Sequence, residues 1–213
     1  MALEAGLAVP DDARWLVMYP AVDFDFGGVR STVIQPHFPS YEALTAAGHD
    51  VQTIQPEDRY DVAVVCVTRS KAHTRDLIAR AASLADLVIV DGQKTDGIES
   101  HYKAVRGRAD VAGTLTKAHG RMFWFKSMDL EDWHCGPSQV EGGFQTLPGV
   151  FSTDAPDPGS ALLADALPEV LGKTVADLGA GWGYLSRHIL ERASVEALHL
   201  VEADQRALDC AQI

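Results

Sequence analysis

The chain has 213 residues, a formal net charge of −12 and a hydrophobic fraction of 46%, which is an ordinary composition for a folded protein and argues against disorder. Its apolar runs are far shorter than the ~20 residues that a membrane-spanning helix needs, so we expect no membrane partner. The 3 cysteines are far apart and give no disulfide framework, and the first residues show no secretion signal. These features predict a cytoplasmic protein.

Short apolar runs in the first two thirds of the sequence are typical of buried strands. They are residues 15–19, 51–54, 62–67, 87–90, 111–115 and 122–125. Helical patterns alternate with several of them, at residues 41–47 with Ser40 as the cap, 70–84, and 98–105. Alternating strands and helices predict an α/β fold with a largely parallel sheet and helices on its faces. We place this first domain at residues 1–140.

A second series of strands and helices follows a connection rich in glycine and proline. The connection, at residues 141–158, includes a short predicted strand at 142–146. The later elements are a helix at 159–167, a strand at 174–178, a helix at 183–192, a strand at 195–201 and a helix at 205–213. Two strands are too few for an independent α/β domain, so we expect residues 159–213 to be the start of a truncated second domain.

A glycine-rich turn joins the strand at 174–178 to the next helix. It contains Gly179, Gly181 and Gly183, and Asp177 precedes it. Glycines at alternate positions let the backbone turn sharply and approach a ligand without interference from a Cβ atom. Glu202 ends the following strand, where a carboxylate can accept the ribose hydroxyls of an adenosine. The order strand, turn, helix, strand, acid predicts a nucleoside-containing cofactor.

Two cofactors use such a turn, and the spacing distinguishes them. A dinucleotide site reads G-x-G-x-x-G and would need glycine at position 184, which is Tyr184. Here the third glycine comes one residue earlier. In addition, the Asp177 carboxylate would repel a pyrophosphate, but it suits a ligand with a cationic amino-acid end. The pattern therefore favours S-adenosylmethionine over NAD.

Several segments resemble the RsmC-type ribosomal RNA guanine-N2 methyltransferases. They are residues 91–98, 117–125, 147–152, 157–163 and 177–183. The resemblance implies two tandem Rossmann-like methyltransferase domains, of which the first has lost its cofactor site; no glycine turn follows residues 62–67. It also implies S-adenosylmethionine as the cofactor and methyl transfer to N2 of a guanine. The expected partner is ribosomal RNA or the small ribosomal subunit.

The catalytic sequence of that family, Asn-Pro-Pro-Phe, is missing here, because the chain contains no asparagine. The asparagine side chain accepts protons of the guanine amine and aims its lone pair at the methyl carbon. We therefore expect no catalytic residue in this chain and no turnover by it alone. A second hypothesis is a non-catalytic RNA-binding or interaction module on a degenerate methyltransferase fold.

A basic stretch inside the acidic chain permits RNA binding. Residues 69–126 hold 11 basic and 6 acidic side chains, a local balance of +5. Lys117, His119 and Arg121 lie close to the aromatic residues 123–125, and together they could form an RNA-binding platform. Two structural alternatives remain: the basic side chains are solvated helix faces, and the aromatic residues belong to the core.

Two further groups have weaker functional signals. Residues 91–97 follow a strand, and Lys94 there could hold a phosphate or the segment could shape a turn that caps the next helix. His119, His134 and Cys135 lack the spacing of metal ligands, so we expect no metal.

Overall fold

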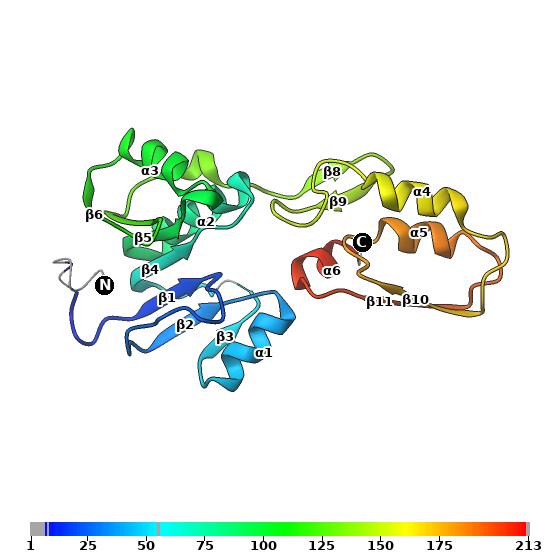
Figure 1. The fold of residues 1–213 in the computed structure, drawn as a ribbon, viewed down its shortest axis with the longest axis horizontal. Coiled ribbons are helices and arrows are strands. Elements are labelled where there is room, and N and C mark those ends of the chain that lie inside the picture. Colours follow the sequence, from blue (N-terminus) through cyan, green and yellow to red (C-terminus); the bar gives the residue numbers. More distant parts are fainter. Residues whose placement is uncertain (1–6, 8, 55, 212–213) are drawn as a thin grey trace. The chain divides into compact units, whose positions relative to one another are not determined.

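The computed structural model describes residues 7, 9–54 and 56–211 of the chain (Figure 1). This part of the chain forms two compact units that divide between Cys135 and Gly136. No helix in it is long and apolar enough to cross a membrane.

The first unit is built on a seven-stranded mixed sheet with the order β3-β2-β1-β4-β5-β7-β6. Its strands are β1 (Trp15–Met18), β2 (Ser31–Ile34), β3 (Asp50–Gln52), β4 (Tyr60–Cys66), β5 (Ala85–Gln93), β6 (Val111–Lys117) and β7 (Gly120–Lys126). The first five strands pair in parallel, whereas β7 is antiparallel to both neighbours. The strand order reverses between β1 and β4, as in doubly wound α/β folds. The predicted α/β class is confirmed.

Helices cover both faces of this sheet. They are α1 (Phe38–Ala46), α2 (Lys71–Leu84) and α3 (Ile98–Arg106), with short 3-10 turns η1 (Lys94–Asp96) and η2 (Glu131–Trp133). Leu16 and Met18 of β1 join one core with residues of α2 and α3. Trp15 and Val17, which point the other way, join a second core with Leu44 of α1. The alternation of side chains along a strand explains how one short strand supplies both cores.

The structure corrects two of the predictions for this unit. Strand β2 was missed, since four residues between loops give little periodicity. The predicted cap at Ser40 is wrong: α1 begins at Phe38, with Pro39 in its first turn and His37 as the cap residue. Ser40 Oγ instead lies 3.1 Å from Nδ1 of His37. By contrast, Ser70 caps α2, since its hydroxyl accepts a hydrogen bond from the backbone N–H of His73.

The second unit contains two small sheets and three helices. Its elements are β8 (Ser138–Val140), β9 (Phe144–Thr146), α4 (Pro158–Ala166), β10 (Thr174–Leu178), α5 (Tyr184–Leu190), β11 (Ala197–Val201) and α6 (Gln205–Ala211). The segment predicted as one strand at 142–146 is the second half of a β8–β9 hairpin, whose turn holds Gly142 and Gly143 at positive φ. The last two residues of the predicted helix at 205–213 lie outside the described residues.

Strands β10 and β11 form a parallel pair with one covered face. Figure 1 shows α4 and α5 along one side of this pair. On the other face the side chains of Leu178 and Val201 are 76% and 52% exposed. An isolated parallel pair cannot bury both faces, because parallel strands are normally covered on both sides.

Candidate functional site

The glycine turn lies at the carboxyl end of β10, which is the edge where parallel sheets hold ligands. Gly179, Gly181 and Gly183 have φ values of +77°, +54° and +90°. These values fall in the left-handed region, which costs side-chain-bearing residues free energy. The N–H groups of Gly179 and Ala180 both donate to the carbonyl of Val201, at 2.8 and 3.1 Å. The turn is thereby tied to the end of β11, where Glu202 follows.

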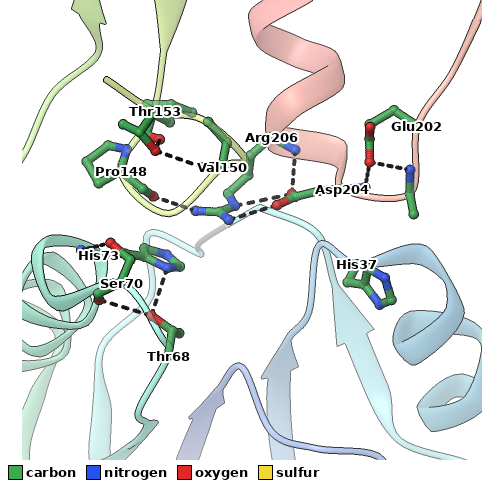
Figure 2. A network of polar contacts seen from close by, with 12 residues as sticks. His37, Thr68, Ser70, His73, Pro148, Val150, Thr153, Glu202, Asp204 and Arg206 are labelled. Atoms are coloured by element: carbon green, nitrogen blue, oxygen red, sulfur yellow. Dashed lines mark hydrogen bonds and ion pairs between the residues drawn. The ribbon is translucent and has the colours of Figure 1, made fainter. Parts of the chain in front are cut away.

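Glu202 is hydrogen-bonded directly to the glycine turn. Its Oε2 accepts from the N–H of Gly181 at 2.7 Å. Its Oε1 accepts from the N–H groups of Ala203 and Asp204 at 2.7 and 2.9 Å; Figure 2 shows Glu202 beside Asp204. A carboxylate has about four acceptor positions, so one remains on Oε2 for an incoming hydroxyl. Binding both ribose hydroxyls requires one backbone N–H to give up its bond to Glu202.

Asp177 is buried beneath the turn. Its Oδ2 accepts a 2.6 Å hydrogen bond from the hydroxyl of Ser186, which links β10 to α5. Asp177 also lines a cavity of about 200 Å³ beside the turn. Asp177 therefore stabilises the packing of α5 on β10 and also belongs to the lining of the cavity.

The cavity brings the turn together with two segments that sequence reasoning gave no role. Its lining includes residues 177–182 together with Phe151, Ser152, Asp157, Ser160 and Leu163. Asp157 caps α4 by accepting from the backbone N–H of Ser160 at 2.9 Å. These residues belong to two of the segments that carry the family resemblance, so the sequence did contain a signal for them. The spacing of residues along the chain, however, does not predict that they contact the glycine turn. The carboxylates of Asp157 and Asp177 in the lining and the position of Glu202 suit a ligand with a ribose and an amino-acid end.

A larger cavity, of about 810 Å³, lies in the first unit. Its lining includes Arg14, Ser31, Asp50 and Tyr60, at the amino ends of β1 to β4. Ligands of open α/β sheets bind at the opposite, carboxyl edge. For this reason we place the candidate site at the glycine turn, although its cavity is smaller.

Lys117, His119 and Arg121 lie at the turn between β6 and β7. Ala118 and His119 have φ values of +49° and +63° there. Arg121 is engaged on three sides: its Nε is 2.9 Å from Oε1 of Glu99, its Nη1 donates to Thr114 Oγ1, and its guanidinium lies 4.2 Å from the ring centre of Tyr102. The charge of Arg121 thus has a structural use, while the side chains of Lys117 and His119 are exposed.

The aromatic platform proposed beside these residues is wrong. Phe123 and Phe125 are fully buried, and Trp124 is 6% exposed, so the three rings belong to the two cores. Residues 91–97 form the end of β5, the turn η1 and a left-handed Gly97 at the start of α3. Burial raises the pKa of the Asp91 carboxyl in this segment. Over the part of the chain that the structure describes, no cluster of three or more potential metal ligands occurs.

Comparison with known proteins identifies relatives of both halves of the chain. Residues 141–213 match the methyltransferase small domain family. The ribosomal RNA small subunit methyltransferase C of Acinetobacter baumannii is 26% identical over 171 residues, which is 74% of this chain and 51% of that protein. The protein of the same description from Serratia proteamaculans is 30% identical over 127 residues, or 57% of this chain and 37% of that protein. The chain spans about half the length, or less, of these relatives.

A solved structure shows the same fold. It is described as the T. thermophilus 16S rRNA N2 G1207 methyltransferase (RsmC) in complex with AdoMet and guanosine. It matches this chain with a TM-score of 0.77 and 22% identity, over 99% of this chain and 64% of that one. At this identity the match shows the fold alone. Together with the curated relatives, it confirms the resemblance that the sequence predicted.

Proposed function

We propose that this RsmC-like chain, whose residues 141–213 belong to the methyltransferase small domain family, is part of a class I S-adenosylmethionine-dependent methyltransferase. The observation that carries the proposal is the contact between the Gly181 N–H and Glu202 beside the cavity at the turn. The curated relatives are described as ribosomal RNA small subunit methyltransferases. We infer that the substrate is the exocyclic N2 of a guanine in small-subunit ribosomal RNA.

Different residues of the second unit would bind different parts of the cofactor. Glu202 would accept ribose hydroxyls through its open acceptor position on Oε2. The turn at Gly179, Gly181 and Gly183 would allow the cofactor to approach the protein backbone closely. Asp177 would face the cationic amino group of the cofactor. When bound, S-adenosylmethionine supplies an electrophilic methyl group on a sulfonium.

The nucleophile needs positioning that the residues of this chain do not supply. A guanine amine is weakly nucleophilic, because its lone pair is delocalised into the ring. Acceptor groups that take its protons and fix its direction accelerate attack. The sequence contains no asparagine for this task. We therefore assign cofactor binding to this chain and no catalytic residue.

We further propose that the two units are tandem methyltransferase-type domains. The expected first domain, residues 1–140, would instead end at Cys135, where the two units divide, because β8 (Ser138–Val140) pairs with β9 of the second unit. The expected connection at 141–158 and the cofactor-binding domain that begins at 159 would both lie in the second unit. The sheet order of the first unit, with its reversal between β1 and β4, supports a doubly wound origin. Strand β1 takes the place at the switch point, and Tyr19 and Pro20 follow it where a cofactor-binding strand would have a glycine turn.

The proposed cellular partner is ribosomal RNA or the small ribosomal subunit in the cytoplasm. The basic balance of residues 69–126 supports an RNA contact on the first unit. The same feature favours the second candidate function, a module that binds RNA without methylating it. Both proposals share the RNA partner and differ in the chemistry.

Methyl transfer to small-subunit ribosomal RNA distinguishes the two functions. The full natural protein would be incubated with the RNA and isotopically labelled S-adenosylmethionine, and the RNA then digested to nucleosides. The enzyme proposal predicts label in N2-methylguanosine. RNA binding without any labelled nucleoside would support the binding module, and label confined to another nucleoside would overturn the guanine N2 substrate.

A further inference from the structure

Arg206 joins the start of α6 to the loop of residues 147–153. Figure 2 shows its side chain between Asp204 and the loop. Its Nη2 and Nε donate to the two carboxylate oxygens of Asp204 at 2.8 and 3.3 Å, and its Nη1 donates to the carbonyl of Pro148 at 3.1 Å. The side chains of Arg206 and Asp204 are only 17% and 24% exposed. A guanidinium held by a carboxylate at two points has a fixed direction, so Asp204 aims Arg206 at the loop.

Trp182 holds the same loop from the glycine turn. Its indole Nε1 donates to the carbonyl of Phe151 at 2.9 Å, and its ring is buried. Inside the loop, the hydroxyl of Thr153 donates to the Val150 carbonyl at 2.7 Å. Ser152 has a φ of +53°, an unfavourable value for a residue with a side chain that persists only where the surroundings fix it. The loop is therefore fixed from both sides, although the Phe151 side chain is 69% exposed.

These contacts form a closed chain of hydrogen bonds that includes Glu202. Gly181 donates to Glu202, which also accepts from the N–H of Asp204. Asp204 holds Arg206, Arg206 holds the loop at Pro148, and Trp182, the neighbour of Gly181, holds the loop at Phe151. The glycine turn and the loop, which both line the cavity, are thus connected through hydrogen bonds to Glu202. Glu202 and Arg206 do not line the cavity, whereas Phe151 and Ser152 of the loop do. A ligand that is anchored at Glu202 and occupies the cavity would therefore have its other end beside the loop.

We propose that Arg206 and Trp182 are positioning residues that hold the 147–153 loop as a preformed wall for the amino-acid end of the cofactor. This inference rests on the proposed function. With the ribose at Glu202 and the amino-acid end beside Asp177, the wall at Phe151 and Ser152 faces the amino-acid end and not the nucleoside. A wall that is already in place avoids the entropic cost of ordering a loop on binding.

The ligand pair S-adenosylhomocysteine and adenosine tests this division. Isothermal calorimetry on the full natural protein would compare Arg206→Lys, which keeps the charge and loses the planar guanidinium, with Trp182→Phe, which keeps an aromatic ring and loses the N–H. Each variant should bind S-adenosylhomocysteine about tenfold more weakly, as expected for one lost hydrogen bond in the wall. Adenosine, which does not reach the wall, should bind with unchanged affinity.

Arg192→Lys is the matched control, because Arg192 also donates to a proline carbonyl of this unit, Pro168 at 3.2 Å, away from the turn. It should bind both ligands as the unaltered protein does. Unchanged affinity for S-adenosylhomocysteine in both test variants would overturn the inference and leave the proposed function intact. An equal loss for both ligands would also overturn it, since that pattern indicates general disruption. A lack of S-adenosylhomocysteine binding by the unaltered protein would overturn the proposed function together with the inference.

Discussion

The Ser186 hydroxyl and the Asp177 carboxylate form a hydrogen bond of 2.6 Å between two buried side chains. Replacing Ser186 by alanine leaves a buried acceptor without this partner, which costs about 1–3 kcal/mol. We expect Ser186→Ala to lower the free energy of unfolding by this amount in urea denaturation. Ser138→Ala, at an exposed position of β8, is the control and should change it by less than about 0.5 kcal/mol. Equal stability of the two variants would contradict a structural role for this pair.

Gly183 is the glycine of the turn with the least tolerance for a side chain. It has a φ of +90°, and a Cβ atom there would lie 3.1 Å from the Cβ of Ala211. We expect Gly183→Ala to destabilise the second unit by roughly 1–2 kcal/mol, since the left-handed backbone and the crowding both oppose alanine. Gly172→Ala is the comparison, because a Cβ there meets only an ordinary contact at 3.6 Å. Thermal unfolding followed by circular dichroism would measure the difference, and a neutral Gly183→Ala would refute it.

His101 should make the stability of the first unit depend on pH. Burial lowers its pKa to about 4, with further lowering by the charges of Arg75 and Lys71 on α2. A histidine with a depressed pKa binds its proton more readily in the unfolded chain. Its contribution is therefore complete above the unfolded pKa of about 6.5 and is lost as the pH falls toward 4, by up to about 3 kcal/mol.

Urea denaturation between pH 4 and pH 7 tests this dependence. The unaltered protein should lose stability as the pH falls through this window, whereas His101→Gln, which has no titrating ring, should lose less. A nuclear magnetic resonance titration of the His101 ring gives the pKa directly. A value near 6.5 in the folded protein would contradict the prediction.

Lys117 tests the proposed RNA contact of the first unit. Binding to small-subunit ribosomal RNA should weaken as salt rises, because each neutralised phosphate releases counterions. Lys117→Glu should weaken binding and reduce the slope of log affinity against log salt by about one. Arg30→Glu makes the same charge change at an exposed position outside the basic stretch and should have a smaller effect. Equal effects of the two variants in filter binding would move the RNA contact elsewhere.

Periodic apolar runs were sufficient to predict most of the fold. The strands β4, β5 and β10 and the helices α2 and α3 lie where their patterns predicted them, because each buries a regular face. Strand β2 was missed, since its four residues form a strand only by pairing with β1 and β3. The exact start of α1 was also out of reach, because its cap residue is His37, which is not a usual cap residue and makes no side-chain cap hydrogen bond.

Part of the candidate site was also predictable from the sequence. Glycine spacing and the acid after the next strand place Gly181 and Glu202 together, since neighbouring parallel strands end at one edge. The wall at Phe151 and Ser152 depends on the long-range contacts of Arg206 and Trp182, which no local pattern encodes. The aromatic residues 123–125 were ambiguous, because a strand of alternating large side chains fits a core as well as a surface platform.

Calorimetry with S-adenosylhomocysteine is the most direct test of the central claim, that the turn and Glu202 form a cofactor site. The full natural protein should bind this ligand, and Glu202→Ala should weaken binding by ~1–3 kcal/mol through the lost ribose hydrogen bonds. Glu196→Ala, which removes an exposed carboxylate paired with Lys173 in the same unit, should leave the affinity unchanged. Absence of binding by the unaltered protein, or an affinity that Glu202→Ala does not change, would contradict the account.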